Sequence, residues 1–316
     1  MGACFGGLAG DAMSTPRPRI LCFGEVLWDC LPSGRLPGGA PLNVAYHLHR
    51  LGAEALVVSA VGRDALGGEM LAHLDACGLS TEYIARHDSL PTGTVGVELG
   101  ADGQPSYAIH RDVAWDAIPC DERVFAAAHS CDALVFGSLA ARTAANRSAL
   151  AALRATPCIL RIMDVNLRPP FAERADVLAL AGDTDWIKLN EHELADLTGM
   201  PPGWPHDILP ALETLRAQTG CGRVCVTAGA RGAALWADGE LHIAEVPAVQ
   251  VCDTIGAGYA FTAALLHGLL TMPGDRRRIL QRACALGALV ASLPGGQPAY
   301  DAEMAIGGGG GSRTRS

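Results

Sequence analysis

Short apolar runs alternate with helical segments along most of the chain, and this alternation predicts the fold class. Six runs rich in Val, Ile, Leu and Ala have the length of buried strands, and they span residues 20–27, 55–62, 132–137, 158–164, 185–190 and 223–229. Segments with apolar residues at helical spacing separate several of them, at residues 41–52, 64–78 and 142–155. Such alternation indicates a central, mainly parallel sheet covered on both faces, so we expect an α/β three-layer sandwich.

Residues 92–111 depart from this pattern. Two stretches with β character flank an Ala-Asp-Gly turn, which is a hairpin signal. We expect this hairpin to leave the sheet as a small β lid over one domain at residues 20–303. Residues 1–19 are expected to be a disordered extension, and the glycine-rich residues 304–316 a flexible tail.

Composition and charge narrow the class of ligand. The 316 residues are 49% hydrophobic and 18% charged, which suits a sizeable core. With 24 Lys and Arg against 33 Asp and Glu, the net charge is −9, so we expect neither a nucleic-acid nor an anionic membrane partner. No apolar stretch is long enough to span a membrane. The eleven cysteines form no CxxC pair, which favours reduced thiols in a cytoplasmic protein with a small-molecule ligand.

The first candidate site follows the first strand. Asp29 comes shortly after that strand, and Gly38 and Gly39 precede a helix that contains Asn43. A carboxylate and an amide can hydrogen-bond vicinal hydroxyls, and paired glycines let the backbone approach a ligand closely. The same residues also suit an ordinary turn with a helix cap, and the pattern leaves both interpretations open.

The second candidate site is the segment DVNLRPP. Asp164, Asn166 and Arg168 alternate beyond a strand. In an extended backbone these side chains share one side, which brings together a carboxylate, an amide and a guanidinium, as a phosphoryl-transfer site needs. A solvated loop is the alternative.

Two further motifs each have a structural and a functional interpretation. Asn190 and Glu193 have the spacing of a capping box and equally that of a pair that contacts magnesium through water. Thr227, Gly229 and Gly232 suit a turn that passes close to a nucleotide, although many hairpins share this T-x-G-x-x-G pattern.

The segment Gly256-Ala257-Gly258 opens an apolar helix. Unpaired N–H groups at a helix start converge on one point at the positive end of the helix dipole, so this segment predicts an anion site. A tight packing turn is the alternative, and no Walker motif occurs in the chain.

Taken in order, these motifs resemble those of the PfkB carbohydrate kinases, the ribokinase-like family, and within it the fructokinase-like branch. The resemblance covers residues 20 to about 303, and the AWD triplet at 114–116 adds to it. It implies a ribokinase-like sandwich with a β lid and transfer of the γ-phosphoryl group of ATP to a ketose such as fructose. It also implies Mg²⁺ and K⁺ as cofactors. We further expect a homodimer through the lid.

The resemblance implies a role for each motif. The sugar would be bound by Asp29, Gly38, Gly39, Asn43 and Asn166. The nucleotide would be bound by Lys188, Asn190, Thr227, Gly229 and Gly232. The transferred phosphoryl group would meet Gly256, Ala257, Gly258 and Arg168. Mg²⁺ would be held through water by Asn190 and Glu193, and a monovalent cation would lie near Asp253 and Thr254.

Tyr259 departs from the family pattern, in which this position holds the aspartate that takes the proton from the sugar hydroxyl. A phenol with a pKa of about 10 hardly accepts a proton at pH 7, and loss of a general base costs about 10²–10⁴ in rate. Three functions stay open: a sugar kinase with impaired activity, a catalytically silent sugar- or nucleotide-binding pseudokinase, and a kinase for another acceptor such as 2-keto-3-deoxygluconate or a nucleoside.

Overall fold

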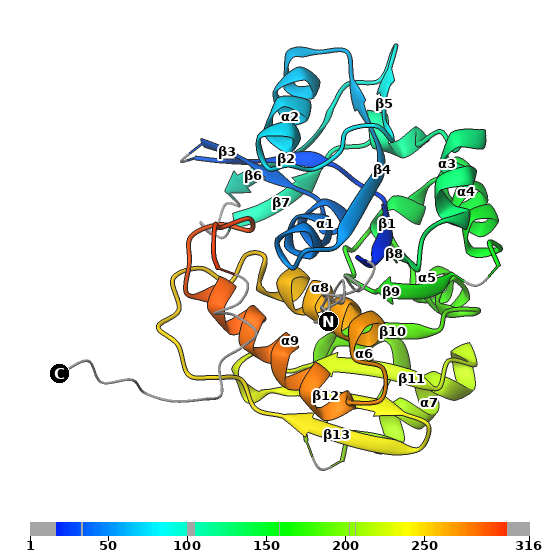
Figure 1. Ribbon diagram of the computed structural model, residues 1–316, viewed down its shortest axis with the longest axis vertical. Coiled ribbons are helices and arrows are strands. Elements are labelled where there is room, and N and C mark those ends of the chain that lie inside the picture. The colour runs from blue at the N-terminus through cyan, green and yellow to red at the C-terminus, as the bar shows by residue number, and fades with distance from the viewer. Residues whose placement is uncertain are drawn as a thin grey trace, which may run out of the picture.

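The main sheet crosses the molecule from one end to the other (Figure 1). The computed structural model describes residues 17–301 except 33, 100–104, 158, 202 and 206, and within these the sheet has nine strands in the order β13-β12-β11-β10-β9-β8-β1-β4-β5. Strands β5 to β11 of this order pair in parallel, while β12 and β13 are antiparallel. The strands of this sheet are β1 (Arg19–Phe23), β4 (Glu54–Gly62), β5 (Ile84–His87), β8 (Ala133–Gly137), β9 (Leu160–Asp164), β10 (Trp186–Asn190), β11 (Arg223–Thr227), β12 (Ala233–Ala237) and β13 (Glu240–Ala244).

Helices cover both faces of this sheet, and each face has its own apolar core. One core joins the sheet to α1 (Ala40–Arg50), α2 (Ala65–Ala76), α8 (Ala257–Thr271) and α9 (Arg276–Ala291). The other joins it to α3 (Glu122–His129), α4 (Ala144–Arg154), α5 (Arg174–Ala181), α6 (Glu191–Thr198) and α7 (Leu209–Thr219). The predicted three-layer α/β sandwich is therefore confirmed.

The prediction of one strand over residues 20–27 is wrong in its second half. Strand β1 ends at Phe23, and Gly24 takes a φ of 146°, which turns the chain out of the main sheet. A Cβ at Gly24 would lie 2.7 Å from Cγ of Pro41, so a side chain there would clash with α1. The residues that follow form β2 (Leu27–Leu31) in a second sheet.

The second sheet is the lid, and it has the strand order β3-β2-β6-β7 among the described residues. The hairpin expected at 92–111 is present as β6 (Gly93–Leu99) and β7 (Pro105–Ile109), and its turn lies outside the described residues. The sequence did not predict that β2 and β3 (Gly34–Gly38) extend this hairpin into a four-stranded lid. The lid thereby carries Asp29 on β2.

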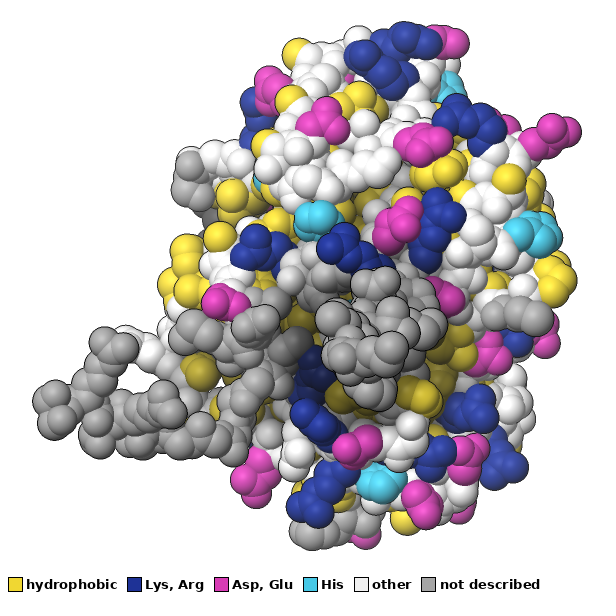
Figure 2. All heavy atoms as spheres, viewed as in Figure 1, with side chains coloured by type: hydrophobic (Ala, Val, Ile, Leu, Met, Phe, Trp, Pro, Cys, Tyr) yellow, Lys and Arg dark blue, Asp and Glu magenta, His cyan; other side chains and the backbone are white. Residues whose placement is uncertain are grey.

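The surface and the chain ends say little about the function. Figure 2 shows positive and negative side chains interspersed over one face of the molecule, as is typical of a solvated surface. No helix among the described residues is long and apolar enough to cross a membrane. The expected extension lies outside the described residues up to residue 16, and the expected tail at residues 304–316 lies wholly outside them.

A buried ion pair anchors the lid to the core. Nε and Nη2 of Arg142 lie 2.6 and 2.7 Å from the two carboxylate oxygens of Asp116, and these side chains are 3% and 9% exposed. Arg142 also donates to the carbonyl of His110 next to β7, and its guanidinium lies 3.9 Å from the ring centroid of Trp115. The AWD triplet therefore has a structural role where the lid meets the sheet.

We expect replacement of Asp116 by Ala to lower the free energy of unfolding by about 3–5 kcal/mol, because Arg142 would stay buried without its carboxylate partner. Urea denaturation of the two proteins measures this difference. Glu82→Ala is the control, since it breaks the exposed pair with Arg123 and should cost less than about 1 kcal/mol. Equal losses in both variants would contradict this account.

Candidate active site

A cavity of about 850 Å³ lies at the carboxyl ends of β9, β10 and β11 and extends to the lid strands β2 and β3. In an open parallel sheet this is the edge at which ligands bind. Most of the residues singled out in the sequence line it: Asp29, Gly39, Asn43, Asn166, Arg168, Lys188, Asn190, Glu193, Thr227, Gly229, Thr254, Gly256, Gly258 and Tyr259. Gly38, Gly232, Asp253 and Ala257 are not among its lining residues.

One end of the cavity lies between the lid and the start of α1. Gly39 is the N-cap of α1 with a φ of 113°, and a Cβ there would lie 2.2 Å from the carbonyl oxygen of Glu25. Gly38 is not among the lining residues, and a Cβ there would lie 2.3 Å from Oδ2 of Asp29. Burial raises the pKa of Asp29 from 3.8 to about 6, although Arg168 opposes the shift. This end presents a carboxylate and the amide of Asn43 to a ligand.

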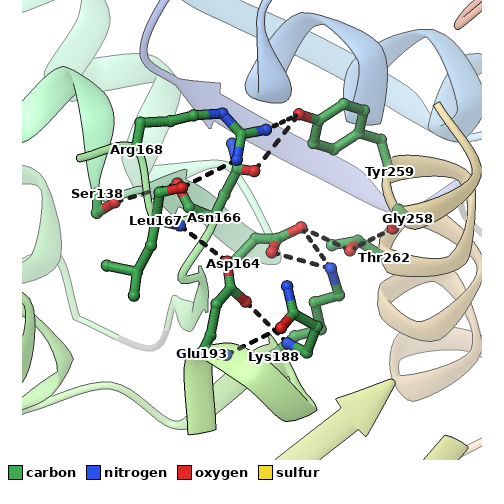
Figure 3. A network of polar contacts seen from close by, with 11 residues as sticks. Ser138, Asp164, Asn166, Leu167, Arg168, Lys188, Glu193, Gly258, Tyr259 and Thr262 are labelled. Carbon is green, nitrogen blue, oxygen red and sulfur yellow. Dashed lines mark hydrogen bonds and ion pairs between the residues drawn. The ribbon is translucent and has the colours of Figure 1, made fainter. Parts of the chain in front are cut away.

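A buried polar network lies beneath the middle of the cavity (Figure 3). Nζ of Lys188 on β10 lies 3.1 Å from Oδ1 of Asp164 on β9, and both side chains are less than 10% exposed. The hydroxyl of Thr262 donates to Oδ2 of Asp164 at 2.7 Å and lies 2.9 Å from the carbonyl of Gly258. The network thus fixes the first turn of α8 to the sheet edge.

Asn166, Arg168 and Tyr259 meet above this network (Figure 3). Nη2 of Arg168 donates to the Tyr259 hydroxyl at 3.3 Å, and that hydroxyl donates to Oδ1 of Asn166 at 3.5 Å. The assumption of an extended backbone is wrong here, because Asn166 has a φ of 45°. This turn directs Asn166 and Arg168 toward the phenol, while Asp164 points down to Lys188. Burial raises the pKa of Tyr259, although Arg168 opposes the shift.

Asn190 and Glu193 form the capping box of α6. The Asn190 side chain accepts from the backbone N–H of Glu193 at 2.9 Å, and Oε2 of Glu193 accepts from that of Asn190 at 2.8 Å. Oε1 of Glu193 accepts from the N–H of Leu167, next to Asn166. The structural interpretation of this motif is confirmed, and Glu193 in addition ties α6 to the loop after β9.

Two residues of the T-x-G-x-x-G segment line the cavity, and the third packs against the neighbouring strand. Thr227 pairs with Asn190 in the register of β10 and β11, and both line the cavity with Gly229. Gly232 lies apart from it: its φ is 121°, and a Cβ there would lie 2.4 Å from the carbonyl oxygen of Ala244. Gly232 therefore lets β12 start close to β13.

The start of α8 presents backbone N–H groups to the cavity. Gly256 is the N-cap with a φ of 84°, and a Cβ there would lie 2.5 Å from Cα of Gly296. The N–H groups of Gly256 and Gly258 have no hydrogen-bond partner within the described part of the chain, whereas that of Ala257 bonds the Thr254 carbonyl at 3.4 Å. Two free N–H groups and the helix dipole make this turn suited to an anion.

Asp253 joins two loops beside this turn. Its carboxylate oxygens accept from the backbone N–H groups of Ile255 at 2.9 Å and Gly295 at 3.2 Å. With both oxygens engaged, Asp253 holds the loop before α8 against the chain that follows α9, while Thr254 lines the cavity.

Glu25 is a buried cavity residue that the sequence patterns did not indicate. It is 2% exposed and lines the cavity, its Oε1 accepts from the N–H of Ala40 at 3.0 Å, and its Oε2 has no partner among the described residues. Burial raises the pKa of Glu25, although hydrogen bonds from the backbone oppose this shift. A carboxylate inside an apolar strand pattern was the signal that could have identified it. Thr262 was missed as well, because its partner Asp164 is distant in sequence.

The chain belongs to the pfkB family of carbohydrate kinases, whose family model matches residues 20–303. Its relatives include a fructokinase of Klebsiella pneumoniae, 31% identical over 274 residues that cover 79% of this chain and 84% of that protein. Another is "Probable fructokinase-6, chloroplastic" of Arabidopsis thaliana, 28% identical over 95% of this chain and 84% of that protein. The chain is therefore a fructokinase-like sugar kinase by homology, and its sequence identity to these relatives is modest.

Solved structures share the fold. The fructokinase of Vibrio cholerae O395, crystallised with fructose, ADP and a calcium ion, matches with a TM-score of 0.75 and 25% identity over 89% of this chain and 94% of that one. The ribokinase of Arabidopsis thaliana, in complex with ribose and ATP, matches with a TM-score of 0.75 and 24% identity over 92% of this chain and 99% of that one. The ribokinase-like architecture predicted from the sequence is therefore confirmed.

The raised pKa of Asp29 makes a prediction about stability. Its pKa in the fold, about 6, lies above the ordinary 3.8, so the folded state binds this proton more tightly and the free energy of unfolding falls as the pH rises from about 4 to 6. Asp29→Asn does not titrate. We therefore expect the stability of Asp29→Asn relative to the unsubstituted protein to increase between pH 4 and pH 7 in urea denaturation. A difference that stays constant over this range would contradict the assignment.

Proposed function

We propose that the protein binds a ketose such as fructose at Asp29 and Asn43 and the phosphates of ATP at the start of α8, as a sugar kinase whose phosphoryl transfer is slowed by Tyr259. The hydrogen bond that Tyr259 accepts from Arg168 and the one that it donates to Asn166 carry this proposal, because they hold the phenol in the same cavity as Asp29 and the start of α8. The lid strand β2 brings Asp29 to the same cavity as the free N–H groups of Gly256 and Gly258.

Two cationic side chains, Arg168 and Lys188, line the cavity that would hold the phosphates. Arg168 lines the cavity, and a Cβ at Gly258 would lie 3.7 Å from Nζ of Lys188. Burial alone would lower the pKa of Lys188, but Asp164 and Glu193 beside it raise the pKa above its ordinary value, so the ammonium stays charged. These groups would stabilise the negative charge on the phosphoryl oxygens during transfer.

The transfer forms a bond between the sugar oxygen and the γ-phosphorus and breaks the bond from that phosphorus to the β–γ bridging oxygen. The sugar hydroxyl must also lose its proton. The Tyr259 phenol is a poor acceptor for it, since burial raises its pKa and keeps it protonated at neutral pH. Binding and charge stabilisation would persist in this site, while proton removal would be slow.

Mg²⁺ would be held mainly by the phosphates and water in this site. No cluster of three His, Cys, Asp or Glu side chains suited to a metal occurs among the described residues. Both oxygens of Glu193 already accept backbone N–H groups, which fits contact through water rather than direct coordination. When bound, Mg²⁺ supplies charge neutralisation on the phosphates. A K⁺ near Asp253 and Thr254 would rest on backbone carbonyls, because both oxygens of Asp253 are engaged.

A catalytically silent binding protein is the second candidate. The observation that favours it is again Tyr259, whose hydroxyl accepts a hydrogen bond from Arg168 and donates one to Asn166 in the cavity. In that function the cavity would bind sugar and nucleotide without turnover.

We expect Tyr259→Asp to raise fructose-dependent conversion of ATP to ADP by about 10²-fold or more over the unsubstituted protein, because a carboxylate would replace the phenol as proton acceptor. A coupled assay of ADP formation measures this, with fructose, 2-keto-3-deoxygluconate and a nucleoside as acceptors.

Tyr259→Asn is the matched control, since it removes the ring without supplying a base. If Asn restores turnover as well as Asp does, the bulk of the ring and not the missing base limits the reaction. Turnover by the unsubstituted protein equal to that of Tyr259→Asp would refute the proposed impairment. If no variant turns over but fructose and ADP stabilise the protein against heat, the silent binding function is supported.

We also propose that the protein forms a dimer through the lid. Strand β3 is an edge of the lid sheet among the described residues, and Leu36 on it is 37% exposed. An edge strand with an apolar side chain is suited to pairing with a second copy. We expect Leu36→Glu to shift the protein from dimer to monomer in sedimentation velocity, and a monomer before substitution would refute the proposal.

A further inference from the structure

The chain after α9 crosses α1 and forms part of the cavity wall. We call residues 292–300 the C-terminal strap. The hydroxyl of Tyr46 donates to the carbonyl of Pro298 at 2.9 Å, and the His47 ring lies 3.1 Å from the carbonyl oxygen of Gly296 and 2.9 Å from the hydroxyl of Tyr300. Gly296 lines the cavity. The strap is therefore fixed to the helix that carries Asn43.

Gln297 on this strap connects α2 to Asn43. Nε2 of His73 lies 2.9 Å from Oε1 of Gln297, and Nε2 of Gln297 donates to Oδ1 of Asn43 at 2.9 Å. Asn43 is 4% exposed and lines the cavity, and its Nδ2 has no hydrogen-bond partner within the described part of the chain. The three side chains form a relay that ends at the cavity.

The relay has a direction. Because Oε1 of Gln297 can only accept, the facing Nε2 of His73 carries a proton. The NH₂ group of Gln297 then donates to the side-chain oxygen of Asn43. The NH₂ group of Asn43 is thereby left to donate to a ligand. Sγ of Cys77 lies 3.5 Å from the same His73 nitrogen, and burial raises the pKa of this thiol, so Cys77 places no charge on the relay.

We propose that Gln297 is a positioning residue for the sugar site, which orients Asn43 so that its NH₂ group donates to a sugar hydroxyl. The inference rests on the proposed function. A sugar hydroxyl placed between these side chains would accept a hydrogen bond from the NH₂ group of Asn43 and donate one to the carboxylate of Asp29. If Asn43 presented its oxygen instead, the hydroxyl would face two acceptors with one proton. One acceptor would then be left unpaired.

Two substitutions at Gln297 test this proposal by isothermal titration of D-fructose and, separately, of ADP. In Gln297→Glu the new carboxylate still accepts from His73, but it can no longer donate to Asn43. Asn43 must then turn its NH₂ group toward the carboxylate, which directs its oxygen toward the sugar. Gln297→Leu removes the relay. We expect each to raise the dissociation constant of fructose about tenfold and to change that of ADP less than about twofold.

Tyr46→Phe is the matched control, because it removes a hydrogen bond to the same strap without touching Asn43. We expect it to leave both dissociation constants within about twofold. The proposal is overturned if the Gln297 variants bind fructose as the unsubstituted protein does, or if they weaken fructose and ADP equally, as general loosening of the strap would. Absence of fructose binding by the unsubstituted protein would instead refute the proposed function, and with it the role of the relay.

Discussion

The geometry of the cavity depends on the buried ion pair between Asp164 and Lys188. Burying two charges costs several kcal/mol for each charge unless their partners are well placed. The neighbouring strands and the first turn of α8 must therefore keep their positions around the pair. Thr262 completes the pair and connects it to the carbonyl of Gly258. The helix start therefore lies at a fixed position above the sheet edge. Its free N–H groups and the Lys188 ammonium then face the same part of the cavity.

The lid and the strap complete the site from distant parts of the chain. The chain leaves the main sheet at Gly24, and strand β2 then carries Asp29 to the cavity, while the strap brings Gln297 to Asn43 from 254 residues away. Tyr259 lines the same cavity and accepts a hydrogen bond from Arg168. Under the proposed function, binding groups that persist beside a phenol at this position would account for either a slow kinase or a silent binding protein.

The sequence predicted those parts of the structure that local pattern controls. Periodicity located β4, β8 and β10 and the helix after Gly39, and turn chemistry located the lid hairpin. It did not separate β1 from β2, because the break at Gly24 depends on the close approach of Pro41. Nor could it predict the left-handed turn at Asn166, the unpaired oxygen of Glu25 or the relay through Gln297. Those features depend on contacts between residues that only the folded chain brings together.

A crystal structure with fructose and a non-hydrolysable ATP analogue tests the central claim most directly. The account predicts fructose at Asp29 and Asn43, the terminal phosphate at the start of α8, and the Tyr259 side chain between them, with no carboxylate within hydrogen-bonding distance of the hydroxyl that faces the phosphorus. A structure in which Tyr259 has moved away and another carboxylate, such as that of Glu25, bonds this hydroxyl in line with the phosphorus would contradict it.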